Sequence, residues 1–201
     1  MSSQELFLTD FLKECSWELD ENQGEAASRD SDWVVDYEGP LWMVRCRYEN
    51  LTDAAMRALS AWVVRRRKAL VTCTVFRPDR RYPLLLPSFS NTGLGISSVT
   101  DTTVNLTGIS PSSGHISAGD MLSYKTAADG YYVGEVIADV TASSGNAAVL
   151  VHPPPQTPHA SPVPKLKEAI GEFKLVSRPQ LVEVPDRKRG VSFELQQVVR
   201  V

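Results

Sequence analysis

Residues 41–76, LWMVRCRYENLTDAAMRALSAWVVRRRKALVTCTVF, contain the order of elements that decides the fold. Apolar and polar side chains alternate from Trp42 to Glu49, as expected of a strand with one face on a core. Apolar residues then recur at helical spacing over residues 53–68, with Thr52 in position to cap the helix and cations at its end. Alternation returns at residues 70–76. The stretch therefore predicts a strand, an amphipathic helix and a second strand.

The residues upstream predict one more strand and an acidic surface. Trp33, Val35 and Tyr37 alternate, and the Gly39–Pro40 pair is typical of a turn, so residues 33–37 are expected to pair with the strand at 42–48. Carboxylates cluster nearer the N-terminus, where a solvated surface is the simpler interpretation. These carboxylates belong to Asp10, Glu14, Glu18, Asp20 and Glu21.

The residues downstream are rich in short strands. The Ser- and Gly-rich run at 88–98 is typical of a linker. Four alternating segments separated by turn residues follow it, which predicts a small antiparallel barrel. They lie at residues 102–108, 120–125, 130–140 and 146–152. Prolines then crowd residues 153–164, as in an extended return connection, and strand patterns resume at 171–177, 181–184 and 191–201.

These patterns predict a mainly β protein with one helix. The first block has too few strands to close a sheet alone, so we expect the C-terminal strands to complete it. The predicted organisation is a β-sandwich or barrel formed by residues 1–92 and 156–201, with the helix at 53–68. A small antiparallel β-barrel at residues 93–155 is inserted into it.

Composition excludes several classes of protein. The 201 residues carry a net charge of −3, which is too balanced for a dedicated nucleic-acid binder. Cys15, Cys46 and Cys73 are too few and too unevenly spaced for a disulfide framework or a zinc site, and they favour a reducing compartment. No apolar stretch is long enough to cross a bilayer, and the N-terminus lacks the pattern of an export signal. We expect a soluble protein without a membrane partner.

No catalytic or cofactor-binding motif is found. His115, His152 and His159 do not have the spacing of metal ligands. Residues 108–112, GISPS, lack the second glycine of a nucleophile elbow, and the lone Gly93-Leu94-Gly95 is a weak match to a phosphate loop. The prediction is therefore a protein that is not an enzyme and that has no cofactor and no metal site.

Basic residues allow three interpretations. In the first, they lie at the end of a helix and in solvated turns. In the second, they make a local contact with nucleic acid, and in the third they form an interface where arginines pair with carboxylates of a neighbouring subunit. Separated acidic and basic clusters in a nearly neutral chain suit head-to-tail pairing of subunits. The candidates for a subunit interface or a lumen are Arg65, Arg66, Arg67, Lys68, Arg80, Arg81, Arg187 and Arg189.

The order of the motifs resembles a known family. The motifs of this chain are, in order, SWELD (16–20), WMVRCRYENL (42–51), the helix TDAAMRALSAWVVRRRKAL (52–70), RPDRRYP (77–83), SPSSGHISAGDMLSY (110–124), GYYVGEVIADVTASSGNAAVLVHPPP (130–155), GEFKLVS (171–177) and VSFELQQV (191–198). This order is similar to that of the distal tail proteins of long-tailed bacteriophages, in which a β-rich tail-hub domain carries an inserted small barrel. Each motif is loose on its own, but their order and spacing together are more specific.

The resemblance implies a structural role in the virion tail. Such proteins form a ring, usually a hexamer, that joins the tail tube to the hub and adsorption proteins. DNA passes through its lumen, and assembly takes place in the cytoplasm of the host bacterium. Within the same class, the alternatives are another minor tail or tail-tip protein and a tail terminator. From a different class, a carbohydrate-binding module would use Tyr124, Tyr131 or Tyr132 to hold a sugar, although strand packing is the more ordinary use of such tyrosines.

Overall fold

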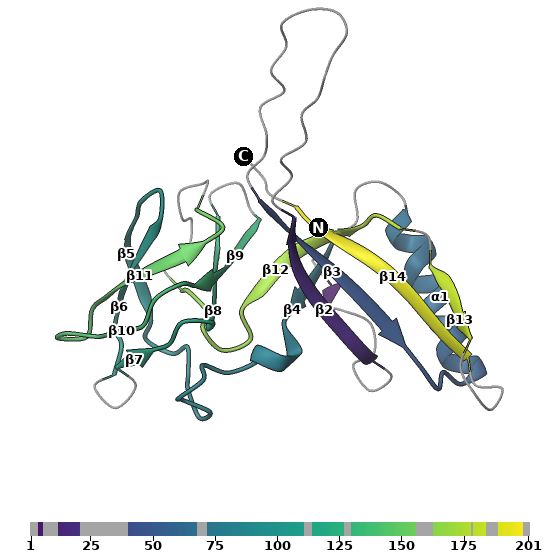
Figure 1. Cartoon of the computed structure of the whole chain (residues 1–201), viewed down its shortest axis with the longest axis horizontal. Helices are drawn as coiled ribbons and strands as arrows, with labels where there is room; N and C mark the ends of the chain where they lie inside the picture. The colour runs from purple at the N-terminus through teal and green to yellow at the C-terminus, as the bar shows by residue number, and fades with distance from the viewer. Residues whose placement is uncertain are drawn as a thin grey trace, which may run out of the picture.

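A computed structural model gives the fold and describes residues 4–5, 12–20, 40–67, 72–110, 114–126, 130–155, 163–177, 179–183 and 189–198. Over these ranges the chain forms two large curled, mostly antiparallel sheets, a small two-stranded sheet and one α-helix (Figure 1). The strand expected at residues 33–37 lies outside the described residues. Among the described residues, no helix is both long enough and apolar enough to cross a bilayer.

The first sheet combines strands from the two ends of the chain. Its members are β1 (Gln4–Glu5), β2 (Leu12–Asp20), β3 (Leu41–Tyr48), β4 (Cys73–Phe76), β12 (Ile170–Leu175), β13 (Gln180–Glu183) and β14 (Arg189–Gln197). They lie in the order β1-β4-β12-β14-β3-β2, with β13 paired to the other end of β14. Only the β1–β4 pairing is parallel among these described strands. Because β12 and β14 separate β4 from β3, this sheet cannot form before the chain returns from its middle part.

The second sheet comes entirely from the middle of the chain. Its members are β5 (Gly95–Val99), β6 (Thr103–Thr107), β8 (Met121–Lys125), β9 (Tyr131–Val136) and β11 (Ala147–His152), in the order β5-β6-β11-β9-β8. The short strands β7 (His115–Ile116) and β10 (Val140–Thr141) pair with each other beside it. All of these lie within the predicted insert of residues 93–155, and the division into domains at its ends stays a prediction.

Two segments interpreted from composition turn out to contain strands. The prediction of a linker at 88–98 is wrong over its last four residues, because Gly95–Val99 form β5 with Ile96 buried and Ser97 and Ser98 exposed. The acidic N-terminal segment contains β2, in which Glu14 and Glu18 are exposed while Trp17 is buried. Serines and carboxylates on the solvent face of a strand concealed the alternation of the other face.

Helix α1 (Asp53–Arg67) covers part of the inner face of the first sheet. Its start has the expected cap, because the Thr52 Oγ1 accepts a hydrogen bond from the Ala55 amide at 3.2 Å. On the buried side of the helix, Leu59, Trp62 and Val63 join the core of the sheet. The Trp62 ring lies 5.6 Å from that of Phe193 on β14. Packing of this apolar stripe, rather than intrinsic propensity, holds the helix in place.

The rest of that inner face packs against the second sheet. Met121 of β8 and Val133 of β9 belong to the same buried cluster as Trp42 and Phe173. The Trp42 Nε1 donates a hydrogen bond to the Val133 carbonyl at 3.2 Å. At Gly171 of β12 an added Cβ would lie 2.6 Å from Val133 Cγ1, so the absence of a side chain permits this close approach. The two sheets therefore share a core at their junction, which we call the seam.

The fold class predicted from the sequence is confirmed. The described residues are mainly β, they include one α-helix, and their curled antiparallel sheets form a barrel-like arrangement. Inside the second sheet, a separate cluster that includes Val104, Leu106 and Leu122 forms a second core.

Candidate functional site

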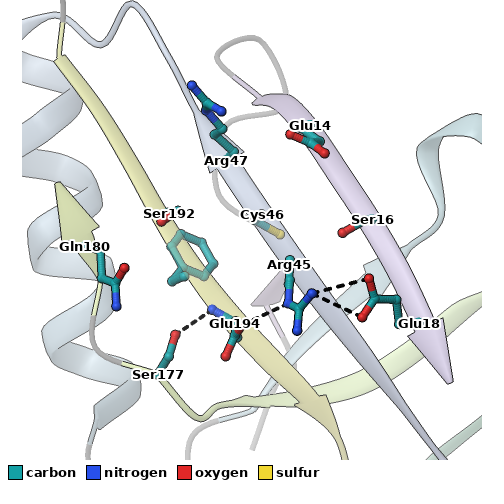
Figure 2. Close-up of a pocket in the computed structure, with 11 residues that line it drawn as sticks. Glu14, Ser16, Glu18, Arg45, Cys46, Arg47, Ser177, Gln180, Ser192 and Glu194 are labelled. Carbon is teal, nitrogen blue, oxygen red and sulfur yellow. Dashed lines mark hydrogen bonds and ion pairs between the residues drawn. The ribbon is translucent and has the colours of Figure 1, made fainter. Parts of the chain in front are cut away.

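The face of the first sheet that points away from α1 is polar (Figure 2). Successive residues of a strand point to opposite faces, so the residues between the core positions of β2, β3 and β14 meet on this side. We call it the outer face. It is hollowed by a depression of about 390 Å³. The lining residues are Glu14, Ser16, Glu18, Arg45, Cys46, Arg47, Ser177, Gln180, Ser192, Phe193 and Glu194.

Arg45 lies at the centre of the outer face between two carboxylates. Its Nε is 2.9 Å from Glu194 Oε1 on β14, and its Nη1 is 3.2 Å from Glu18 Oε2 on β2. Ser177 Oγ accepts a hydrogen bond from the Glu194 amide at 2.7 Å, which holds the backbone of β14 at this point. The network therefore ties three neighbouring strands together across their solvent-exposed side.

The residues that line the depression of the outer face carry an excess of negative charge, with Glu14, Glu18 and Glu194 against Arg45 and Arg47. Arg47 pairs with Glu49 at 2.9 Å, so its charge is balanced at the margin of the depression. Glu14 has no ion-pair partner among the described residues. Since Arg45 also faces two carboxylates, the surface offers uncompensated acceptors to a cationic partner.

The exposed side of α1 has the opposite character. Arg57 and Arg65 are exposed there, and beyond Asp53 in the first turn the described side chains of the helix include no acid. Small or apolar residues fill the rest of this side, namely Ala54, Ala58, Ser60, Ala61 and Val64, which is 58% exposed. A solvated helix face ordinarily mixes charges of both signs. We call these exposed residues the helix face.

Arg80, one of the predicted interface residues, binds within its own chain. It ends the short 3₁₀ helix η2 (Pro78–Arg80), which follows β4 and leads toward the second sheet. Its Nη1 lies 2.7 Å from Glu135 Oε1 on β9 and donates a hydrogen bond to the Gly119 carbonyl at 2.5 Å. Arg77 reaches the other oxygen of Glu135 at 3.5 Å. This pair of arginines therefore bridges the two sheets beside the seam.

Arg81 binds the segment that returns from the second sheet to the first. Its Nε and Nη2 lie 2.7 Å and 2.5 Å from Glu168 Oε1, and its carbonyl accepts a hydrogen bond from the Glu168 amide at 2.8 Å. Glu168 raises the pKa of the Arg81 guanidinium through this hydrogen bond and its charge. Nearby, the Asn91 side chain makes three hydrogen bonds to the backbone of Leu166 and Lys167. The outgoing and returning chain segments are thus fastened to each other.

The remaining predicted residues are spread over other elements. Arg65 is exposed in the last turn of α1, and Arg66 and Arg67 follow it there, with side chains outside the described part of the structure. Arg189 begins β14, and its side chain is likewise outside the described part; Lys68 and Arg187 lie outside it altogether. The structure brings Arg80 and Arg81 together with their own carboxylates and does not bring them to Arg65. The assignment to an interface or a lumen stays a prediction.

The arrangement of the outer face could not be predicted from the sequence, although Glu14 and Glu18 were expected at a solvated surface. Glu18, Arg45 and Glu194 are far apart in the chain, and only the pairing of β2, β3 and β14 brings them together. One signal was present, because Cys15, Trp17 and Leu19 alternate with charged or polar residues in the manner of a strand.

Two other kinds of site, for a metal ion and for a sugar, concern residues away from the outer face. Over the described ranges, no group of three or more His, Cys, Asp or Glu side chains is placed to hold a metal ion. Tyr124 and Tyr132 are buried with ring centroids 4.9 Å apart, and burial raises the pKa of both phenols. These two rings therefore pack inside the second sheet and offer no exposed platform for a sugar.

No protein-family model matches the chain, and comparison with curated proteins finds no significant match. The resemblance to distal tail proteins consequently stays a prediction from the motifs.

Proposed function

We propose that the chain is a non-enzymatic structural subunit of a bacteriophage tail, forming a ring at the distal end that joins the tail tube to the hub and adsorption proteins. The order of sequence motifs supports this proposal. The topology supports it as well, because residues 95–152 form a separate set of strands inserted between the strands of the first sheet, which come from both ends of the chain. An inserted barrel on a tail-hub domain has that connectivity.

The observation that carries the proposal is the opposite charge of two opposite surfaces. The outer face has unbalanced carboxylates, with Glu14 unpaired among the described residues. The helix face, on the other side of the same sheet, presents Arg57 and Arg65. One surface of the chain is therefore complementary to the other, which favours contact between the outer face of one copy and the helix face of the next.

Repeated contacts of this kind produce a ring when the rotation between copies closes. The shapes are compatible, because a helix that exposes Ala54, Ala58 and Ala61 lets its backbone come close to a hollowed surface. Arg65 would pair with carboxylates that Arg45 leaves unsatisfied. A closed ring of such contacts leaves no copy with an uncovered charged face. An open chain of copies leaves one uncovered face at each of its two ends.

The proposed partners follow from the position in the tail. They are other copies of the chain, in a ring that we expect to be a hexamer, together with the tail tube protein and hub or tail-tip proteins. DNA contacts the ring only as it passes through the lumen. The protein acts in the virion tail after assembly in the host cytoplasm, and the role needs neither a cofactor nor a membrane.

Light scattering and native mass spectrometry of the purified chain test the proposal. We expect a closed multimer of one size whose population falls as salt is raised, since exposed charges are screened. A stable monomer at all protein and salt concentrations, together with absence of the chain from purified virions, would overturn it. Position in a tail reconstruction separates the distal ring from a tail terminator or another minor tail protein.

A further inference from the structure

Two cysteines lie opposite each other on neighbouring strands of the first sheet. Cys15 of β2 and Cys46 of β3 are direct partners in the antiparallel register. Both thiols are free. They lie on the core side of the sheet, where Cys46 is 1% exposed and Cys15 is half-buried at the margin of the core. No role in the proposed ring requires this pair.

The register brings the two side chains within the reach of a disulfide bond. Directly opposed residues of antiparallel strands have Cα atoms about 4.5–5.5 Å apart. A disulfide spans Cα separations of about 4.4–6.8 Å. The two thiols also shift each other's pKa in opposite directions, as expected of neighbouring side chains. Bond formation therefore requires side-chain rotation without a shift of either strand.

The two thiols differ in a way that assigns their roles. A hydrogen bond from Cys46 lowers the pKa of Cys15, because it stabilises the thiolate. The same hydrogen bond, followed by burial, raises the pKa of Cys46. Cys15 is also the more accessible of the two. Since the thiolate is the nucleophile in exchange reactions, Cys15 is the residue that attacks first.

We propose that Cys15 and Cys46 form an oxidation site that yields a cross-strand disulfide between β2 and β3, with a small-molecule disulfide as the oxidant. The Cys15 thiolate attacks one sulfur of the oxidant, which breaks its S–S bond and releases one small thiol. Cys46 then loses its proton and attacks the Cys15 sulfur, which forms the protein disulfide and releases the second small thiol. Two protein thiols are oxidised and one small disulfide is reduced, so electrons and protons balance.

The linkage would fix a strand at the end of the sheet. Among the described strands, β2 pairs with β3 alone. A disulfide here closes the chain from residue 15 to residue 46 and restricts the unfolded state, which stabilises the fold. Cys73 does not take part, because β12 and β14 separate its strand from β3 and its thiol contacts the Phe173 carbonyl at 3.7 Å.

Oxidation of the intact chain by oxidised glutathione tests the site. The folded protein is incubated with the oxidant, its free thiols are alkylated, and its peptides are identified by mass spectrometry. We expect a single Cys15–Cys46 linkage, a free Cys73, and a higher melting temperature that dithiothreitol reverses. Cys46→Ala is expected to retain glutathione on Cys15, whereas Cys15→Ala leaves Cys46 unmodified. Cys73→Ala is the matched control and forms the same linkage as the unsubstituted chain.

Three results would overturn the proposal. They are a Cys46–Cys73 linkage, formation of the Cys15–Cys46 bond only in denaturant, and retention of all three free thiols by the folded protein in an excess of the oxidant. The principal measurement uses the unsubstituted chain, so it does not depend on the folding of any variant.

Discussion

Two clusters of arginine and carboxylate occupy different places in this molecule. At the seam, Arg77 and Arg80 bind Glu135 on another sheet, and the Arg77 side chain is only 16% exposed. On the outer face, Arg45 binds carboxylates of the two adjacent strands, and its side chain is 58% exposed. The same chemical groups thus join two sheets at the seam, whereas on the outer face they link strands of a single sheet.

The difference in burial distinguishes charged groups that stabilise the fold from charged groups that a partner can reach. A partly buried pair that also makes hydrogen bonds to the backbone contributes more than an exposed pair, which is typically worth less than about 1 kcal/mol. Arg80 has both kinds of contact, with the Gly119 carbonyl and Glu135. We therefore infer that the seam holds the fold together and that the outer face is free to serve a partner.

The largest expected effect is at the apolar part of the seam. Met121→Ala removes a side chain that is 1% exposed and that joins the second sheet to the core of the first. We expect the free energy of unfolding to fall by about 2–5 kcal/mol, because a cavity opens where the sheets meet. Urea unfolding followed by circular dichroism measures the change.

Leu150→Ala is the matched control, because Leu150 lies in the second sheet but is 40% exposed. Its effect is expected to stay within about 0.5 kcal/mol. Equal effects of the two substitutions, or a loss below about 1 kcal/mol for Met121→Ala, would contradict a shared core at the seam.

Arg80→Met is expected to have a smaller but clear effect. The substitution leaves the Gly119 carbonyl without its guanidinium donor and leaves Glu135 with Arg77 alone, so we expect a loss of about 1–2 kcal/mol of unfolding free energy. A double-mutant cycle with Glu135→Gln measures the part that belongs to the pair. Additive effects of the two substitutions would show that this ion pair does not join the sheets.

Arg45→Met gives the smallest expected change in the stability of the monomer. The ion pairs that it removes are exposed, so a loss below about 1 kcal/mol is expected at ordinary salt, and less at high salt. The same unfolding measurement applies. A loss as large as that of Arg80→Met would contradict the distinction between the two clusters.

Sequence patterns predicted local elements well where one face of the element is apolar. The helix expected at 53–68 runs from Asp53 to Arg67, because its cap, its stripe of apolar residues and its terminal cations all agree. The strand β5 was missed, since a Ser- and Gly-rich edge strand resembles a linker in composition.

Those patterns could not predict contacts between residues that are far apart in the sequence. Arg80 and Glu135 are 55 residues apart and meet only when η2 lies against β9. Glu18, Arg45 and Glu194 converge because β14 returns to pair with β3. The basic residues were recognised as a group, but whether each one binds its own chain or faces solvent depends on the pairing of strands.

The central claim is that unlike surfaces of neighbouring copies meet, and an exchange of charge between those surfaces tests it most directly. Glu14→Lys reverses a charge on the outer face, and Arg65→Glu reverses one on the helix face. Both residues are exposed and neither contributes to the core, so each variant should fold. Glu14 lies opposite Arg47 across β2 and β3, so Glu14→Lys is expected to lower the free energy of unfolding by up to about 1 kcal/mol. Circular dichroism and thermal unfolding verify this before assembly is measured.

Native mass spectrometry of each variant alone and of their equimolar mixture is the decisive measurement. We predict that each variant alone is mainly monomeric because positions 14 and 65 then carry like charge, and that the mixture restores closed multimers with alternating subunits. A chain carrying both substitutions should also assemble. Multimers of each variant alone that equal those of the unsubstituted chain, or a mixture that stays monomeric, would contradict the account.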